Sequence, residues 1–334
     1  MNKKYILLGF MLYLSITIQA QIDPHFTQYY MYPLQLNPGL TGLISDGDVR
    51  VTANTRSQWA SVSNPYNTVG VSGDMLMKNQ WGLGVNILNQ KAGNGGYNYS
   101  NVQVSVANGN IRFGTNGTQH ISMGMQMGVL MTRFDPNKLQ FGDQYSAAIG
   151  YNGGITSRAA VNTLTLSQNL FDIGAGIAYI DEQTDKKVNV YGGISFNHLN
   201  QPQNNFNSEV SRLPMRITAH AGARIIASPT LQFYPNFIYM QQGNAFEATP
   251  GIYAQMKVND IMHVLLGGNY RLNDAVNAFT GIYYKNYSLG LSYDINTSNL
   301  NTIPKTVNSL EMSLSMTLLK NNKLETQFFK CPRF

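Results

Sequence analysis

Charged residues are scarce in this chain: Asp, Glu, Lys and Arg make up 12% of its 334 residues, against roughly 25% in an ordinary soluble domain. Mean hydropathy is only −0.19, and beyond the N-terminal leader no apolar run approaches the length that crosses a bilayer as a helix. The first absence excludes a typical soluble domain, and the second excludes a helical membrane protein. A membrane β-barrel fits both, because its lipid-facing apolar residues alternate with small polar residues inside.

Cysteine is nearly absent as well. The single Cys331 excludes an intramolecular disulfide, and we expect it to be a free thiol near the C-terminus. The formal net charge is +6, but no run of Lys and Arg would neutralise several phosphates together. We therefore expect a mildly basic surface and no nucleic-acid partner.

Motifs that carry chemistry are also missing. The five histidines are scattered without the paired spacing of zinc sites, and no serine lies in a Gly-x-Ser-x-Gly elbow. Gly82-Leu83-Gly84 and Gly174-Ala175-Gly176 faintly resemble nucleotide-binding loops, but both lie inside expected strands with no following helix. We predict that their glycines relieve crowding or bend a strand. The chain is expected to have no cofactor, no metal and no catalytic activity.

The first twenty residues have the pattern of a secretory signal peptide. Asn2-Lys3-Lys4 is a short cationic start, Tyr5 to Ile18 is apolar, and cleavage is expected after Ala20, which would leave Gln21 first. We expect four parts: a signal peptide at 1–20, a periplasmic or plug-like segment at 21–47, a barrel at 48–318, and a tail at 319–334. The predicted location is the outer membrane.

Period-two alternation of apolar and polar residues runs through the rest of the chain, and helical periodicity is nearly absent. About fourteen stretches alternate over the length that a tilted transmembrane strand needs. The predicted fold is all-β: an antiparallel transmembrane barrel with the N-terminal segment packed in or under it. The expected strands are 49–59, 67–77, 80–89, 98–108, 119–131, 171–180, 187–198, 215–227, 230–240, 250–258, 261–271, 277–284, 287–294 and 308–318.

The connections alternate between short turns and longer loops, as in outer-membrane barrels with periplasmic turns and outside loops. The longest loop is expected between Thr132 and Leu170. A soluble β-sandwich would also alternate. Against it, the polar positions carry Gly, Ser, Asn, Gln and Tyr rather than Lys and Glu, and aromatic residues gather at strand ends as in interfacial girdles.

Several basic residues fall on the expected lumen side of their strands. One interpretation is a basic interior that selects anions or holds an acidic peptide. The other is that Asp172, Asp294, Glu311 and the N-terminal segment neutralise it. His220 is expected to be a polar lumen residue rather than a catalytic base. The candidate basic lumen residues are Arg50, Arg56, Arg216, His220, Arg224 and Lys257.

Short motifs at both ends of the chain carry a family resemblance. The N-terminal ones are Asp23-Pro24 with Phe26, Gln28 and Tyr29, then Asn37-Pro38 with Gly42, then Arg56 with Gln58-Trp59; the C-terminal ones are Tyr293-Asp294 and Pro332 with Phe334. In this ordered set the chain resembles the PorP/SprF family of type IX secretion outer-membrane proteins of Bacteroidota. It departs from the family at Tyr32 and at Gly39-Leu40-Thr41.

The resemblance implies a function in secretion and surface attachment. It implies a non-enzymatic barrel that binds, helps export or anchors a secreted cargo, commonly a large adhesin engaged through its C-terminal domain, and that contacts other type IX components in the periplasm or outer membrane. The lipid bilayer is the remaining partner. The alternative is a passive or substrate-specific porin with a basic lumen.

Overall fold

The computed structural model describes most of the chain between Asp23 and Leu318. The described residues are 23–44, 47–59, 65–92, 96–114, 117–135, 138, 141–146, 148–155, 157, 166–183, 186–204, 211–297 and 308–318. The predicted leader (1–20), the cleavage position before Gln21 and the predicted tail (319–334) lie outside these residues. Cys331, Pro332 and Phe334 therefore lie outside them too.

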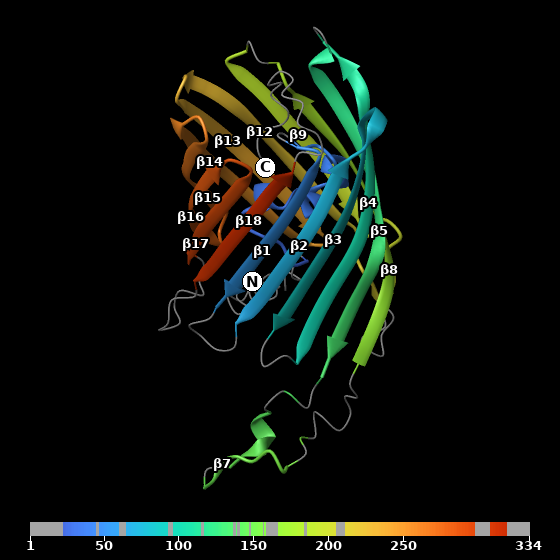
Figure 1. Ribbon diagram of the computed structural model, residues 1–334. Coiled ribbons are helices and arrows are strands. Elements are labelled where there is room, and N and C mark those ends of the chain that lie inside the picture. The colour runs from blue at the N-terminus through green and yellow to red at the C-terminus, as the bar shows by residue number, and fades with distance from the viewer. Residues whose placement is uncertain are drawn as a thin grey trace, which may run out of the picture.

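Fourteen antiparallel strands close into one barrel (Figure 1). Neighbouring strands follow one another in sequence around the wall, and β1 closes the barrel by pairing with β18 from Val49↔Leu318 to Gln58↔Ser309. The strands are β1 Val49–Gln58, β2 Tyr66–Leu76, β3 Trp81–Ala92, β4 Tyr97–Phe113, β5 Gln119–Phe134, β8 Leu166–Asp181, β9 Val188–Asn197, β12 Arg216–Ser228, β13 Leu231–Gln242, β14 Ala245–Asn259, β15 Met262–Arg271, β16 Ala275–Tyr284, β17 Tyr287–Asn296 and β18 Ser309–Leu318.

The barrel is apolar outside and polar inside. On β18, Leu310, Met312 and Leu314 are 46%, 54% and 45% exposed, whereas Glu311 and Ser313 are 2% and 3% exposed. A soluble protein would reverse this order, so the outward apolar face is the surface that contacts lipid. The prediction of a transmembrane antiparallel barrel of about fourteen strands is confirmed.

Long loops and short turns lie at opposite ends of the barrel, which we call the loop end and the turn end. The loop end carries two small hairpins, β6 Tyr145–Ser146 with β7 Gly150–Tyr151, and β10 Gln203–Asn204 with β11 Ser211–Arg212; a one-turn helix, η6 Gly142–Gln144, precedes β6. The turn end carries η3 Lys78–Gln80. Long loops face the outside in outer-membrane barrels. Among the described residues, no helix is long and apolar enough to cross a membrane.

Residues 23–44 pass through the inside of the barrel instead of lying beneath it. They form three short helical turns, η1 Tyr29–Met31, α2 Pro33–Leu36 and η2 Pro38–Leu40. Proline starts both α2 and η2, and the side chain of Asn37 caps η2 by accepting a hydrogen bond from the Gly39 amide. The segment begins level with the loop-end residues of β13 and ends beside the first residues of β1, at the turn end. We call residues 23–44 the plug segment.

Candidate functional site

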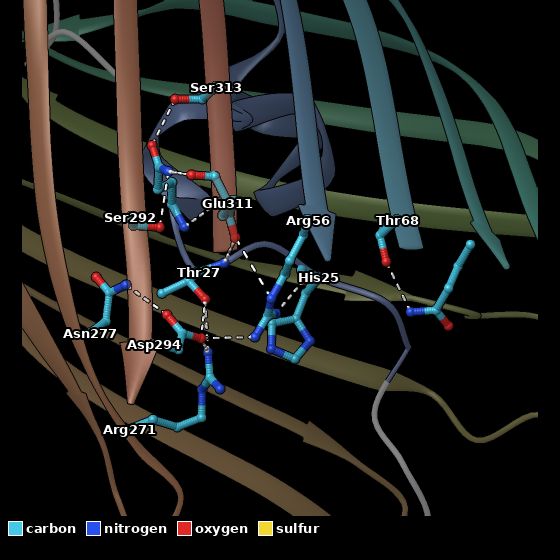
Figure 2. A network of polar contacts seen from close by, with 12 residues as sticks. His25, Thr27, Arg56, Thr68, Arg271, Asn277, Ser292, Asp294, Glu311 and Ser313 are labelled. Carbon is cyan, nitrogen blue, oxygen red and sulfur yellow. Dashed lines mark hydrogen bonds and ion pairs between the residues drawn. The ribbon is translucent and has the colours of Figure 1, made fainter. Parts of the chain in front are cut away.

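A buried ion network joins the plug segment to the wall near the loop end (Figure 2). The Glu311 carboxylate accepts hydrogen bonds from the backbone amides of Thr27 and Gln28, both at 2.8 Å. The Asp294 carboxylate accepts from the Thr27 hydroxyl at 3.0 Å and from Arg56 at 3.0 Å. Two strand carboxylates and one strand arginine therefore hold two consecutive residues of the plug segment.

The same network extends along the wall to β15 and β14. Arg271 donates to the Thr27 hydroxyl at 3.0 Å and lies 3.2 Å from the Glu247 carboxylate. The His25 ring lies 3.0 Å from Glu247, and the His25 carbonyl accepts from Arg56 at 2.8 Å. Charge-assisted hydrogen bonds of this kind are about twice as strong as neutral ones. The plug segment is thus bound to one continuous side of the barrel wall, from β1 through β18 and β17 to β15 and β14.

A second charged cluster holds Asp23, at the start of the plug segment. His198 lies between two carboxylates, with Nδ1 2.8 Å from Asp172 and Nε2 2.5 Å from Asp23. Arg216 lies 3.7 Å from Asp23, and the Asp23 amide donates to the Gln242 side chain at 2.8 Å. The imidazole is 1% exposed. Two buried carboxylates require a cation between them, and a protonated His198 supplies it.

Aromatic side chains of the plug segment fill the middle of the barrel. Tyr30 contacts Tyr253 and Phe279 at ring-centroid distances of 5.4 and 5.3 Å. On the other side, Phe26 and Tyr32 pack with Leu88, Tyr99 and Leu130. Two tyrosine hydroxyl groups of the segment have partners: Tyr29 donates to Asn236 at 2.7 Å and Tyr32 donates to Asn86 at 2.5 Å. Apolar burial and satisfied hydroxyl groups together stabilise the segment inside the barrel.

Near the turn end the plug segment is held by the backbone of Gly42 and by the side chain of Asn37. Asp74 accepts from the Gly42 amide at 2.8 Å and pairs with Arg50 at 2.7 Å. Asn37 donates to the Ile177 carbonyl at 3.0 Å and lies 3.2 Å from the His220 ring. These partners come from opposite sides of the wall. Together with the contacts above, they hold the segment to the wall along its length.

Glycines in the wall make room for this close approach. A Cβ at Gly82 would lie 2.2 Å from the Thr41 carbonyl oxygen, and a Cβ at Gly176 would lie 2.0 Å from Asn37 Oδ1. No real Cβ approaches another heavy atom this closely. The expected role of the two glycine-containing motifs therefore has a physical reason, because each of these glycines lies against the plug segment.

A cavity of about 510 Å³ lies at the loop end, above the ion network. His25, Arg56 and Glu247 lie along its lining, and Trp59 and Phe246 lie among its aromatic residues. Its basic residues already bind carboxylates of the wall. Among the residues that the structure describes, no cluster of His, Cys, Asp and Glu is arranged to hold a metal ion.

The predicted basic residues occupy different places. Arg50, Arg56, Arg216 and His220 are buried in the lumen, and Arg224 is partly buried there. Lys257 is exposed at the turn end and pairs with Asp260 at 2.7 Å. The motif residues Asp23, Gln28, Tyr29, Asn37 and Gly42 hold the plug segment through the contacts above. The motif residue Asp294 binds Thr27 of the plug segment from the wall.

Sequence reasoning missed four residues that hold the plug segment: Asp74, His198, Glu247 and Arg271. Arg271 carried a usable signal, because it lies on the same side of β15 as Leu265 and Asn269, which are also buried. His198 carried none. It follows the last residue of β9, where alternation no longer says which way a side chain points.

Comparison with known proteins places the chain in a family. The model of the type IX secretion system membrane protein family PorP/SprF matches residues 18–316. The chain is a PorP/SprF protein. The expected family and outer-membrane location are thereby confirmed. No curated protein gives a match to this PorP/SprF protein.

Solved structures similar to this PorP/SprF protein are outer-membrane channels. The CymD monoaromatic hydrocarbon channel is 11% identical, with a TM-score of 0.49 over 86% of this chain and 93% of that one. The P. putida toluene transporter TodX is 8% identical, with a TM-score of 0.48 over 85% and 93%. A Pseudomonas aeruginosa FadL homologue is 9% identical, with a TM-score of 0.43 over 84% and 92%. At these identities the likeness says nothing about what this barrel binds.

Alkaline pH is expected to loosen the plug segment. Burial opposes charge on His198, but Asp23 and Asp172 outweigh it and raise the pKa of His198 to about 9, from roughly 6.5 in an unfolded chain. The stabilisation of the folded protein by protonated His198 is complete below about pH 6.5 and is lost as pH rises through about 9. Burial alone would raise the pKa of Asp23, but His198 and Arg216 hold it well below its usual range.

The measurement is the temperature at which the folded band disappears on a detergent gel, taken from about pH 6 to about pH 10. The wild type should lose stability across this range, and His198→Gln should start lower and change less. Parallel profiles for the two proteins would contradict the assignment of this ion cluster.

Proposed function

We propose that this PorP/SprF protein is a non-enzymatic partner of the type IX secretion system that binds a secreted protein at the cell surface. The cargo is engaged through its C-terminal domain and is retained or delivered by the barrel, and a large adhesin is the class of cargo that fits best. The barrel supplies binding surface at its loop end, and other secretion components supply the energy.

The observation that carries this proposal is the filled lumen. The plug segment contacts β13 to β16 through its tyrosines, β17 and β18 through Thr27 and Gln28, and β3 to β5 through Phe26 and Tyr32. A barrel filled on all these sides leaves little open path for solutes. A binding function at the loop end is therefore favoured over passive transport.

The buried charges also count against an anion-selective porin. Arg56 pairs with Asp294 at 3.0 Å and Arg50 pairs with Asp74 at 2.7 Å. Arg216 and Arg271 likewise have carboxylate partners in the lumen. A lumen whose cations are already paired with wall and plug carboxylates has little attraction left for a passing anion.

The β6–β7 hairpin adds an exposed apolar surface at the loop end. It projects beyond the barrel (Figure 1). Ile149 is 72% exposed and Tyr145 is 53% exposed, and the Tyr145 and Tyr151 rings lie 5.4 Å apart. Large apolar side chains grouped on a projecting hairpin are typical of a surface that binds another protein.

Replacing Tyr145 by Ser together with Ile149→Asp is expected to reduce the amount of secreted protein that co-purifies with the barrel more than about tenfold. Burying each side chain contributes about 1.5–3 kcal/mol, and 1.4 kcal/mol corresponds to tenfold in binding. Ser146→Asp is the matched control, since it adds the same charge to the same hairpin and removes no apolar surface. Equal recovery from both variants would exclude the hairpin as a contact.

The proposal itself is tested by isolating the tagged protein from native outer membranes in mild detergent. We expect one large secreted protein in near-stoichiometric amount, and truncating the C-terminal domain of that protein should abolish its recovery. A barrel that comes out alone, from cells in which secretion is active, would contradict the proposal.

A further inference from the structure

Strand β8 of the barrel wall is paired on both sides over only part of its length. β8 pairs with β5 along its whole length, up to Leu166↔Phe134. With β9 it pairs only between Ala175↔Phe196 and Ile180↔Tyr191, because β9 ends at Asn197. Figure 1 shows β4, β5 and β8 reaching past the neighbouring strands at the loop end. The outer part of β8 is therefore an edge inside an otherwise closed barrel.

The start of this edge is covered by a side chain in place of a strand. His198 has a φ of 58° and ends the strand pairing, and the Leu199 amide makes one last main-chain bond to β8, at 2.9 Å to the Ile173 carbonyl. Asn200 then offers its amide group as a peptide would: Oδ1 accepts from the Ile173 amide at 3.2 Å, and Nδ2 donates to the Phe171 carbonyl at 2.7 Å. The ladder of β8 is thus continued by one side-chain amide.

Beyond Asn200 the edge continues without a partner among the described residues. Backbone groups of alternate residues in an antiparallel strand point the same way, so Ser167 and Asn169 face the same side as Phe171 and Ile173. The adjacent β10–β11 hairpin is held to β8 by a side chain, since Gln168 donates to the Gln203 carbonyl at 2.8 Å. The main-chain amides and carbonyls of Ser167 and Asn169 remain available.

This edge lies above the lipid. Outward positions of β8 are apolar at Ile177 and Phe171, which are 44% and 55% exposed, and become polar and exposed at Asn169 and Ser167. An unpaired edge within the hydrocarbon would be very costly, whereas in water it is tolerated. Such an edge is a template to which another chain can add.

Two exposed cations lie near the edge, one on each side of β8. Arg133 lies on β5 directly opposite Ser167, and Arg212 lies on β11 opposite Gln203. No ion pair joins either of them to a carboxylate in the described part of the chain. A strand that adds beside β8 would lie next to the hairpin that carries Arg212, with Arg133 one strand further away across β8, so a segment carrying carboxylates is complementary to the edge.

We propose that the β8 edge from Ser167 to Phe171 captures an extended, acidic segment of the secreted protein by strand addition. This inference rests on the proposed function and names where and how the cargo binds. Main-chain hydrogen bonds to Ser167 and Asn169 give the affinity, and Arg133 and Arg212 select a segment with carboxylates. A segment of about five residues would cover the edge at the strand rise of roughly 3.3 Å per residue.

Asn169→Pro tests the main-chain contact, with Asn169→Ala as its matched control. Proline at position 169 removes the main-chain amide that faces the unpaired edge and places its ring there. The β8 amides that face β5 stay unchanged, as proline on edge strands allows. Recovery of the secreted protein should fall at least about tenfold for Asn169→Pro, since tenfold is 1.4 kcal/mol, and should stay at the wild-type level for Asn169→Ala. Both variants must show the folded gel band.

Amide hydrogen exchange on the wild type gives the second readout. Peptides covering 166–171 should exchange quickly in the isolated barrel and slowly in the complex from native membranes, and the added protection should weaken with salt and in Arg133→Gln. Protection in the isolated barrel, from its own chain or a second copy, would overturn the inference. So would unchanged recovery with Asn169→Pro, which leaves the proposed function standing. Absence of any co-purifying protein would instead be the failure of the proposed function.

Discussion

Arg56→Met is expected to destabilise the barrel by about 3–5 kcal/mol, because it leaves buried carboxylates without their partner. Arg56 is 2% exposed and binds Asp294, and its Nε lies 3.8 Å from Glu311. The same guanidinium donates to the His25 carbonyl. Loss of this side chain therefore weakens both the wall and the docking of the plug segment.

Lys257→Met is the control, because Lys257 pairs with Asp260 on the surface and exposed pairs contribute about 0–1 kcal/mol. Urea unfolding followed by tryptophan fluorescence in detergent gives the free energies. Adding Glu311→Gln to Arg56→Met should recover part of the loss, since the second change removes the unpaired charge. Equal stability of Arg56→Met and Lys257→Met would refute the role assigned to the network.

Gly82→Val is expected to force the plug segment from its position while the wall remains intact. Its Cβ would lie 2.2 Å from the Thr41 carbonyl oxygen and 2.9 Å from Gly42 Cα, both backbone atoms with little freedom to move. Valine is otherwise favoured in strands. The variant should fold as a barrel and should show ion conductance in planar bilayers.

Gly73→Val is the matched control on the neighbouring strand β2. A Cβ there would meet nothing closer than the Arg50 carbonyl oxygen at 3.9 Å. This variant should behave as the wild type does in both folding and conductance. If the two variants gave the same conductance, close contact at Gly82 would not be what holds the plug segment in place.

The strands were predictable because the bilayer imposes a strict pattern on them. Every expected strand is present. In a barrel wall each residue faces either the lipid or the lumen, and this forces apolar and polar residues to alternate along the strand. The extensions were not foreseen: β5 continues to Phe134 and β8 begins at Leu166. Above the lipid the outward residues become polar, as at Arg133 and Asn169, so alternation stops although main-chain pairing continues.

The site was predictable in kind but not in its pairings. Alternation placed Arg56, Asp294 and Glu311 on the lumen side, and their mutual neutralisation was one of two open interpretations. It could not show that Thr27 and Gln28 complete the network, because the plug segment lacks periodicity. Nor could it pair His198 with Asp23, since contacts between residues 175 positions apart depend on the closed barrel.

The measurement that tests the account most directly is the conductance of the purified full chain in planar bilayers at neutral pH. The plug segment fills the lumen from Asp23 to Leu43, so we predict no steady channel from the wild type. We also predict channels after deletion of residues 23–44. A steady open channel from the intact wild type would contradict the central claim and would favour a porin.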